Sequence, residues 1–354
     1  MAYQFKISQI INQALFDPVK GYYQTKNPIG KNNDFITAPE ISSIFAEVIA
    51  SYLLYYFANK KNRFSLVEMG AGTSALFANI LHSIKNLAQK KHQIASDFIE
   101  FGSFHIIEIN PVLKKLQQQN LENFGEQFKI KWHENFSQFL ASKNGEIYFI
   151  SNELFDCFAI DQYLKTQDGW QEKMVEVDDP NNLSNPRLVI ANYDQKINDF
   201  VEQQIGKNLA NHASINAIFE YSQDARNFFS QLSQAIKTHH GIAINCDYGY
   251  DQYHFANSLQ AIKNHQKLDF IDSFYEADIT AHVDFFALDN IAKNFKLETS
   301  LISQRQFLLE LGAEDRKNQL CLLHPQNALK IKQAFDRLVS PLQMGNLFKF
   351  HIIW

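Results

Sequence analysis

The amino-acid sequence predicts an α/β fold in which a mostly parallel sheet is covered by helices on both faces. Three observations lead to this prediction. Short apolar segments alternate with segments of helical periodicity, a glycine turn joins the first such pair, and a stretch of different character interrupts the alternation once. Strands that alternate with helices are typical of parallel sheets. With 354 residues, 45% of them hydrophobic, the chain can bury a large core.

The expected strands and helices follow one another from residue 63 onward. We expect strands at RFSLVEM, SFHIIEI, FKIKW, EIYFIS and GIAINCD, and helices at SALFANILHSIKNLA and PVLKKLQQQNLENF. The polar stretch 85–103 is interpreted as a lengthened helix and loop. The final segment, LFKFHIIW, is expected to be a last strand, antiparallel to ETSLISQ or to another neighbour.

The segment before the first strand is expected to hold an irregular stretch and one buried helix. TAPE matches a capping box, in which the Thr37 hydroxyl accepts from the backbone of Glu40 and the Glu40 carboxylate reaches back. Pro39 is tolerated in such a first turn. The helix following it repeats apolar residues at helical spacing up to Leu53.

Residues 157–240 break the strand–helix rhythm and predict an inserted α+β subdomain. Strand-like WQEKMVEV and RLVIANY flank the turn-rich DDPNNLSNP, and helical segments follow. The expected organisation is therefore a lid and helix at 1–60, the first part of the main domain at 61–156, the insertion at 157–240, and the remainder of the main domain at 241–354.

Composition and charge exclude several classes of protein. A net charge of -5 without basic clusters argues against nucleic-acid binding. Three widely spaced cysteines indicate a reducing compartment rather than a disulfide framework. The start MAYQFKISQI resembles neither a signal peptide nor a presequence, and no apolar run is long enough to cross a membrane. We therefore expect a cytoplasmic protein with no membrane partner and no metal.

The segment LVEMGAGTSALFANIL contains a strand, a glycine turn and a helix. Gly70, Gly72 and Ala75 match the dinucleotide pattern G-x-G-x-x-A, but such a turn also occurs without a ligand. Glu68, just before the turn, would repel a pyrophosphate and tolerate an ammonium and a sulfonium. This favours S-adenosylmethionine over NAD. Glu108, at the end of the next strand, can accept the ribose hydroxyls of either cofactor.

Other polar residues are expected at the same carboxyl edge of the sheet, where ligands of open α/β sheets bind. Trp132 and His133 end the strand FKIKW, and an aromatic side chain there could flank an adenine. The strand EIYFIS leads directly into NELFD, which holds Asn152, Glu153 and Asp156. A helical turn would bring the two acids to one side. The alternative is that Asn152 caps a helix and the acids complement its dipole.

The chain also resembles the MidA family of class I S-adenosylmethionine-dependent methyltransferases over nearly its whole length. The matching segments are GYYQTKNPIGKNNDFITAPEIS, VEMGAGTSAL, IIEINPVLKKLQ, ISNELFD, CDYGY, EADITAHVDF, FLLELG and MGNLFKF. Where that family usually has an arginine followed by a third glycine, this chain has Thr73 and Ser74. The family includes a mitochondrial arginine methyltransferase that assists assembly of respiratory complex I.

The resemblance implies a Rossmann-like class I methyltransferase sheet and an N-terminal lid that folds over the cofactor. Candidate cofactor-binding residues are Glu68, Gly70, Gly72, Thr73, Glu108, Ile109, Trp132, His133 and Asn152, with Tyr22, Thr37 and Pro39 from the lid. Candidate catalytic residues are Glu153, Asp156 and His282. Carboxylates suit a guanidinium acceptor, because it must be held by its charge and lose a proton. In EADITAHVDF, Asp278 or Thr280 is expected to cap a helix with His282 on its first turn.

The expected function is methylation of a protein, with arginine as acceptor implied by the resemblance alone. The acceptor is expected to be a subunit of respiratory NADH dehydrogenase or another bacterial protein, docked on the insertion at 157–240. Two alternatives remain open: a non-enzymatic assembly factor that keeps the fold, and an NAD(P)-dependent oxidoreductase. The assembly state is open between a monomer and a homodimer.

Overall fold

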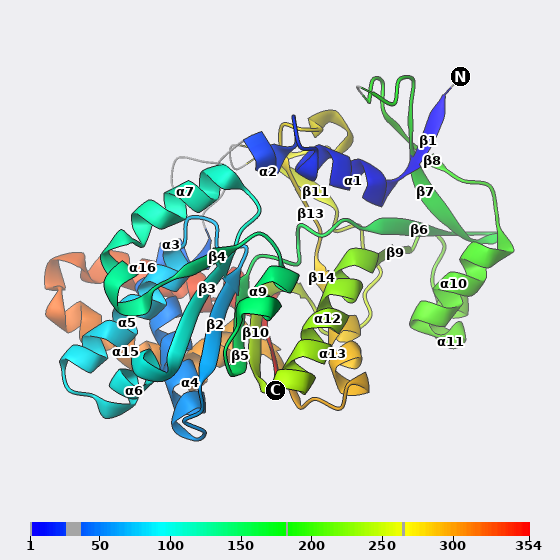
Figure 1. The fold of residues 1–354 in the computed structure, drawn as a ribbon. Helices are drawn as coiled ribbons and strands as arrows, with labels where there is room; N and C mark the ends of the chain where they lie inside the picture. Colours follow the sequence, from blue (N-terminus) through cyan, green and yellow to red (C-terminus); the bar gives the residue numbers. More distant parts are fainter. Residues whose placement is uncertain (1, 26–36, 182, 264–265) are drawn as a thin grey trace. The chain divides into compact units, whose positions relative to one another are not determined.

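The computed structural model describes residues 2–25, 37–181, 183–263 and 266–354. Its larger sheet has the strand order β15-β16-β10-β5-β2-β3-β4. Figure 1 labels the strands from β10 to β4. The strands from β10 to β4 are parallel, whereas β16 is antiparallel to both β10 and β15. The bounds are β2 (Phe64–Met69), β3 (Gly102–Ile107), β4 (Lys131–His133), β5 (Glu146–Asn152), β10 (Gly241–Tyr250), β15 (Thr299–Ser303) and β16 (Phe348–Ile353).

The strand predictions for this sheet are confirmed. Each of the expected segments forms a strand, and the C-terminal one lies antiparallel beside the strand formed by TSLIS, as anticipated. The delay between the first two strands is filled by two helices, α5 (Ala75–Gln89) and α6 (Gln93–Phe101), instead of one helix and a loop.

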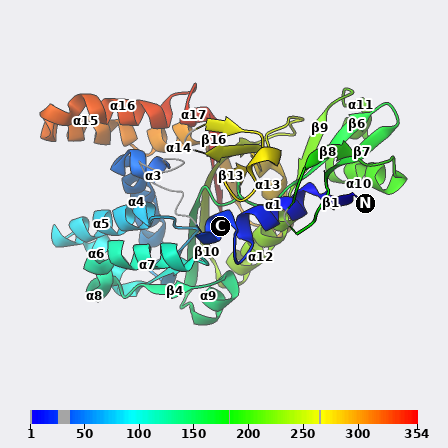
Figure 2. The same ribbon diagram turned by 90° about the horizontal axis from the view of Figure 1, so that it is seen from above.

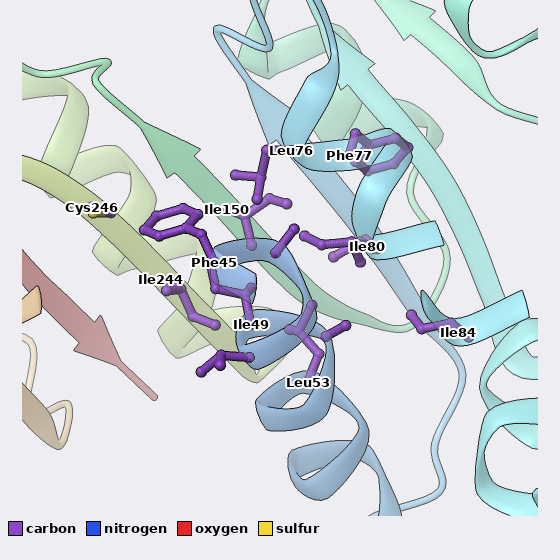
Figure 3. Close-up of a cluster of buried hydrophobic side chains, with 14 of the residues drawn as sticks. Phe45, Ile49, Leu53, Leu76, Phe77, Ile80, Ile84, Ile150, Ile244 and Cys246 are labelled. Atoms are coloured by element: carbon purple, nitrogen blue, oxygen red, sulfur yellow. The ribbon is translucent and has the colours of Figure 1, made fainter. Parts of the chain in front are cut away.

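One face of this sheet packs against α4 (Ser43–Ala58) and α5 (Figure 3). The buried side chains come from both helices and from β5 and β10, and Figure 3 labels Phe45, Ile49, Leu53, Leu76, Phe77, Ile80, Ile84, Ile150, Ile244 and Cys246. The burial of apolar side chains in such a core is the main favourable contribution to the stability of a domain. The opposite face contacts α9 (Phe136–Ser142), where Phe136 lies against Phe149.

The N-terminal helix is broken in two, and the predicted capping box is wrong. A short α3 (Ala38–Ile41) follows Thr37, whose side chain makes no cap hydrogen bond. The chain then turns through Ser42, whose Oγ accepts from the amide of Ile44 at 3.3 Å and begins α4. The apolar helix that the periodicity indicated is α4, and its cap is a serine one turn further along.

The remaining helices of this part of the chain connect the strands or follow them. They are α7 (Pro111–Asn120), the 3₁₀ turn η1 (Glu122–Phe124), α8 (Gly125–Phe128), α14 (Gln304–Glu310), α15 (Ala313–Leu323), η3 (Pro325–Asn327), α16 (Ala328–Val339) and α17 (Met344–Leu347). Figure 2 shows α15 and α16 running side by side. No helix in the described ranges is long and apolar enough to cross a membrane.

The chain folds as two compact units. The larger consists of Asn27–Leu154, Ser230–Gly249 and Asp289–Trp354, and the smaller of Met1–Lys26, Phe155–Phe229 and Tyr250–Leu288. The smaller unit thus combines most of the predicted insertion with the start of the chain and with a segment that follows β10. Helices α12 (Gln223–His239) and α13 (Phe285–Asn294) begin in the smaller unit.

The smaller unit contains two sheets. One has the order β1-β7-β6-β9, with β8 also paired to β7, and the other has the order β12-β11-β13. The bounds are β1 (Tyr3–Lys6), β6 (Asp161–Thr166), β7 (Gly169–Val177), β8 (Arg187–Ile190), β9 (Ile218–Tyr221), β11 (Gln260–Lys263), β12 (Gln266–Leu268) and β13 (Asp278–Thr280). The short β14 (Val283–Asp284) belongs to neither sheet and pairs with β10. Its helices include α1 (Ile7–Phe16), α2 (Tyr22–Thr25), α10 (Gln195–Ile205) and α11 (Lys207–His212), and η2 spans Ile271–Ser273.

Two local predictions are corrected in this region. Asp278 and Thr280 lie in β13 and cap no helix; α13 begins at Phe285, and Asp284 caps it by accepting from the amide of Ala287 at 3.0 Å. His282 therefore lies directly before β14, whose Asp284 caps α13, and not on the first turn of a helix. After β5, residues 153–158 form bends and turns, so neither a helical turn nor a helix capped by Asn152 is present there.

Candidate functional site

The glycine turn between β2 and α5 needs its two glycines. Gly70 and Gly72 have φ values of +71° and +52°, in the left-handed region that glycine adopts without cost. A Cβ on Gly70 would lie 2.9 Å from Cδ1 of Leu154. The amide of Gly70 donates to the carbonyl of Ile107 at 3.2 Å, so the turn is fixed to the end of β3. The turn predicted from the sequence is thus a rigid backbone bend at the carboxyl edge of the sheet.

Ser74 occupies a third left-handed position of the same turn. Its φ is +64°, it is fully buried, and it precedes the first residue of α5. Its Oγ donates to the carbonyl of Thr73 at 2.5 Å instead of capping the helix. The MidA family, which the sequence resembles, usually has glycine at this position. Glycine adopts such a left-handed conformation without cost.

Glu68 is a buried carboxyl group directly before the turn. Burial raises its pKa to about 8, although the amide of Phe77 in α5 donates to it and nearby Glu108 adds a further upward contribution. Its Oε2 has no hydrogen-bond partner among the described residues. Such an orphaned buried acceptor is costly, so it marks a place where a donor of a ligand would be stabilised.

A second group of predicted residues is joined by Gln117, which the sequence analysis missed. Its Nε2 donates to Oε2 of Glu108 at 2.9 Å and to the carbonyl of Gly72 at 3.0 Å, and its Oε1 accepts from Nε1 of Trp132 at 3.2 Å. Gln117 is fully buried in α7, one turn after buried Leu113. A polar residue on the apolar face of a helix was the available signal.

The carboxylate of Glu108 is fixed by hydrogen bonds at the carboxyl edge of the sheet. Besides the bond from Gln117, its Oε1 accepts from the backbone amide of Asn110 at 2.8 Å. Burial raises the pKa of its carboxyl group, and these hydrogen bonds oppose that shift. Asn110 caps α7, so strand, acid and helix start form one rigid corner.

The end of β5 carries a strained glutamate and an unsatisfied amide. Glu153 has a φ of +52°, and its amide donates to the carbonyl of Cys246 at 2.9 Å. Its Oε1 accepts from Nδ2 of Asn152 at 3.0 Å, while Oδ1 of buried Asn152 has no partner among the described residues. A non-glycine residue in this conformation costs energy, and such residues cluster at functional sites.

The lid candidates in the larger unit approach the glycine turn from α3. Oγ1 of Thr73 donates to Oε1 of Glu40 at 3.3 Å, and Oε2 of Glu40 is buried with no partner in the described part of the chain. Pro39 is buried in α3, and Thr37, which precedes that helix, is half-buried. The rest of the predicted lid, residues 26–36, lies outside the described residues.

Three more of the residues predicted to bind the cofactor differ from one another in their surroundings. The ring of His133 lies against His105, with Nε2 of His133 2.9 Å from Nδ1 of His105, and both rings contact Phe139. The side chain of Ile109 is 63% exposed. Tyr22 is fully buried in the core of the smaller unit, with α1. Among these candidates, Gly72, Glu108 and Trp132 are joined through Gln117, and the amide of Glu108 donates to the carbonyl of His133 at 2.9 Å. The cofactor-binding roles of all the candidates stay predictions.

Asp156 and His282 lie near each other in the smaller unit. The amide of Ala281 donates to the carbonyl of Asp156 at 3.0 Å, so the residue before His282 is tied to this acid. The amide of His282 donates to Oγ of Ser258 at 2.9 Å. Burial lowers the pKa of His282, and the nearby charges of His254 and Lys267 lower it further.

The residues of the larger unit fit S-adenosylmethionine. Three buried acceptor oxygens, on Glu40, Glu68 and Asn152, have no partner in the part of the chain that the structure describes, and they call for a ligand rich in donors or positive charge. An ammonium would satisfy this need and favour the charged form of Glu68, whereas a pyrophosphate would not. The Glu108–Gln117–Trp132 corner supplies an acceptor and an aromatic surface next to the turn. No group of three or more potential metal ligands occurs in the described ranges.

Sheet order, the antiparallel strand β16 and the glycine turn together define a class I methyltransferase fold. The family model described as "Putative S-adenosyl-L-methionine-dependent methyltransferase" matches residues 48–302. The chain belongs to this family. The cofactor expected from the sequence, S-adenosylmethionine, is thereby confirmed as that of its family, and the oxidoreductase alternative is overturned.

Individual relatives agree with this assignment. The protein arginine methyltransferase NDUFAF7 of mitochondria is 27% identical in Danio rerio, covering 97% of this chain and 82% of the relative. The Homo sapiens protein is 27% identical and covered over 78% of its length. Among solved structures, a Burkholderia thailandensis protein bound to S-adenosyl-homocysteine has a TM-score of 0.81 at 23% identity. That match covers 99% of this chain and 87% of the other.

Proposed function

We propose that this methyltransferase transfers a methyl group to an arginine side chain of a protein. The curated relatives named above are protein arginine methyltransferases and match along 97% of this chain. The observation that carries the proposal furthest is the strained Glu153, an acid fixed at the end of β5 beside the orphaned amide oxygen of Asn152. An acid held in this way suits an acceptor that is cationic and must lose a proton.

The chemistry asks little of the protein beyond alignment and charge. When bound, S-adenosylmethionine supplies a methyl group already activated by its sulfonium. Glu153 would hold the guanidinium through its carboxylate and localise its charge on the nitrogens away from the attacking one. Asp156 would be the second carboxylate and would accept the released proton, directly or through His282, whose lowered pKa keeps the imidazole neutral and so able to accept a proton.

The acceptor protein is proposed from the relatives and from the organisation of the chain. A subunit of a respiratory NADH dehydrogenase or another bacterial protein would dock on the smaller unit, which contains most of residues 157–240. The cytoplasm is the proposed compartment. Sedimentation would distinguish a monomer from a homodimer.

The test is Glu153→Gln, which keeps the shape and removes the charge. We expect binding of S-adenosyl-homocysteine, measured by calorimetry, to be unchanged. Methyl transfer to peptides with a central arginine should fall by about 10²-fold or more, the usual contribution of a positioned acid or base. Exposed Glu134→Gln is the matched control and should keep full activity.

Three further results test the cofactor site and separate the alternatives. Gly70→Val should abolish cofactor binding, because its side chain would meet Leu154 and adopt a forbidden φ. A wild-type chain that binds the cofactor and methylates lysine peptides instead of arginine peptides would refute the acceptor assignment. Binding without any transfer to purified protein acceptors would favour the assembly-factor alternative.

A further inference from the structure

The smaller unit contains a cavity of about 30 Å³, which is room for one or two water molecules. It lies among the end of β9, the first turns of α12, Tyr250 at the end of β10, and the start of α13; these elements can be followed in Figure 1. Its lining combines aromatic rings with charged groups: Phe155, Phe158, Ile160, Glu220, Ser222, Ala225, Arg226, Tyr250, Ala281, His282, Val283, Asp284 and Leu288. His282, a predicted catalytic residue, is part of this wall.

The guanidinium of Arg226 lies between a carboxylate and an aromatic ring. Its Nη2 donates to Oδ2 of Asp284 at 2.9 Å, and its guanidinium carbon lies 4.6 Å from the ring centroid of Tyr221. A carboxylate in one direction and an aromatic face in another is the combination by which proteins recognise arginine side chains. The side chains of Arg226 and Asp284 are 17% and 15% exposed, so the pair is reachable from solvent.

The two carboxyl groups of the cavity have different tasks. Glu220 is bound into the wall, because it accepts from the amides of Ser258 and Leu259 at 3.0 and 3.2 Å and from Nε2 of Gln162 at 2.7 Å. Asp284 uses Oδ1 to cap α13 and offers Oδ2 only to Arg226 among the contacts described. If Arg226 swung away, Oδ2 would be left half-buried and unpaired, and another guanidinium could replace it.

We propose that this cavity recognises an arginine side chain of the acceptor protein docked on the smaller unit, and that Arg226, in its wall, takes the place of that guanidinium beside Asp284 until an acceptor displaces it. The proposal rests on the arginine specificity proposed above and adds to it the residues that recognise the acceptor. Asp284 is the anchoring carboxylate, Tyr250 is an aromatic wall of the cavity, and Tyr221 is the ring against which the guanidinium lies. Glu220 is a positioning residue that fixes Ser258 and, through it, the backbone of His282. Arg226 acts as an internal competitor.

The competition can be measured by binding alone. The probe is a short capped peptide with one arginine, titrated by calorimetry into the full-length protein saturated with S-adenosyl-homocysteine. In Arg226→Gln the competitor is gone, so the apparent Kd should fall about fivefold or more. In Asp284→Asn, which keeps the helix cap, the Kd should rise about tenfold or more. Peptides with lysine or citrulline should bind far more weakly.

The control removes an equivalent ion pair elsewhere. Arg316 pairs with Glu47 in the larger unit, so Arg316→Gln should leave the Kd unchanged. Stabilisation of each variant by S-adenosyl-homocysteine in a thermal melt reports that it is folded. A folded Arg226→Gln with unchanged or weaker peptide binding would refute the proposal, and so would an unchanged Asp284→Asn. Should Asp284→Asn fail to fold, Arg226→Gln alone decides.

The same titration separates this proposal from the proposed function. Tighter peptide binding in Arg226→Gln, together with no methyl transfer to arginine in any variant, would refute arginine methylation and leave guanidinium recognition standing. Methyl transfer to arginine with no effect of Arg226→Gln on the Kd would support the function and refute this subsite.

Discussion

At the scale of single residues, the site is shaped by backbone conformations that few side chains adopt. Ser74 and Glu153 both have positive φ, and both adjoin residues predicted to meet the cofactor or the acceptor. In Glu153 the strained backbone carries a predicted catalytic acid directly after β5. In Ser74 it accompanies no evident gain, since the side chain only bonds to the neighbouring carbonyl. Strain without compensation should be removable.

Ser74→Gly should therefore raise the free energy of unfolding by up to about 1 kcal/mol, because left-handed geometry costs an L-residue about 1–2 kcal/mol and glycine gives part of this back through chain entropy. Urea denaturation of the cofactor-free protein measures it. Ser96→Gly, in the right-handed helix α6, is the control, and its free energy of unfolding should fall by about 0.5 kcal/mol. An equal loss in both variants would contradict the prediction.

At the scale of elements, several differences from expectation concern where helices begin. The long N-terminal helix is interrupted at Ser42, NELFD is a turn, and α13 begins at Phe285 rather than after Thr280. For α4 and α13 the periodic apolar core of the helix was predicted, whereas its cap was assigned to the wrong polar residue; at NELFD no helix forms. Several Ser, Thr and Asp residues near a helix start can cap it, and the tertiary packing decides which of them does.

The cap of α4 gives a direct test of this reading. Ser42→Ala should destabilise the protein by about 1 kcal/mol, because the amide of Ile44 loses its acceptor. Thr37→Ala, at the cap predicted from the sequence, should cost clearly less, since its hydroxyl makes no cap bond. Thermal or urea unfolding compares the two, and the opposite ranking would restore the capping box.

At the scale of the whole molecule, the larger sheet contains a polar layer on the face covered by α9. His105 and His133 lie ring to ring, Nε2 of His105 is 3.0 Å from Oγ of Ser103, and the Ser103 and Ser65 hydroxyls are 2.8 Å apart. Burial lowers the pKa of His105 to about 3, and that of His133 is lowered as well. The folded protein thus resists protonation of a pair that the unfolded chain protonates near pH 6.5.

This difference makes stability depend on pH. Below about pH 6.5 the unfolded chain binds more protons than the folded one, so the free energy of unfolding should fall between pH 6.5 and 3. One histidine contributes a slope of at most about 1.4 kcal/mol per pH unit. Urea melts of His105→Gln should show a shallower fall over this window than the wild type. Exposed His82→Gln should follow the wild type, and a His105→Gln profile parallel to the wild type would contradict the prediction.

The sequence by itself determined the strands of the larger sheet, the helices on its faces, the glycine turn and the acids at the strand ends. These depend on local periodicity and on backbone conformations that glycine alone adopts easily, both of which are written in short segments. Glu68 before the turn favoured S-adenosylmethionine as the cofactor, the resemblance implied the same, and the family assignment confirmed it.

Only the tertiary structure decided which side chains meet. Gln117 joins Glu108, Gly72 and Trp132 across three elements, His133 turns toward His105, and Arg226 meets Asp284 from 58 residues away. Such contacts depend on strand pairing and helix docking between distant segments, so no local pattern encodes them. Helix caps belong to the same category, because neighbouring polar residues compete for each one and the packing around the helix selects the residue that fills it.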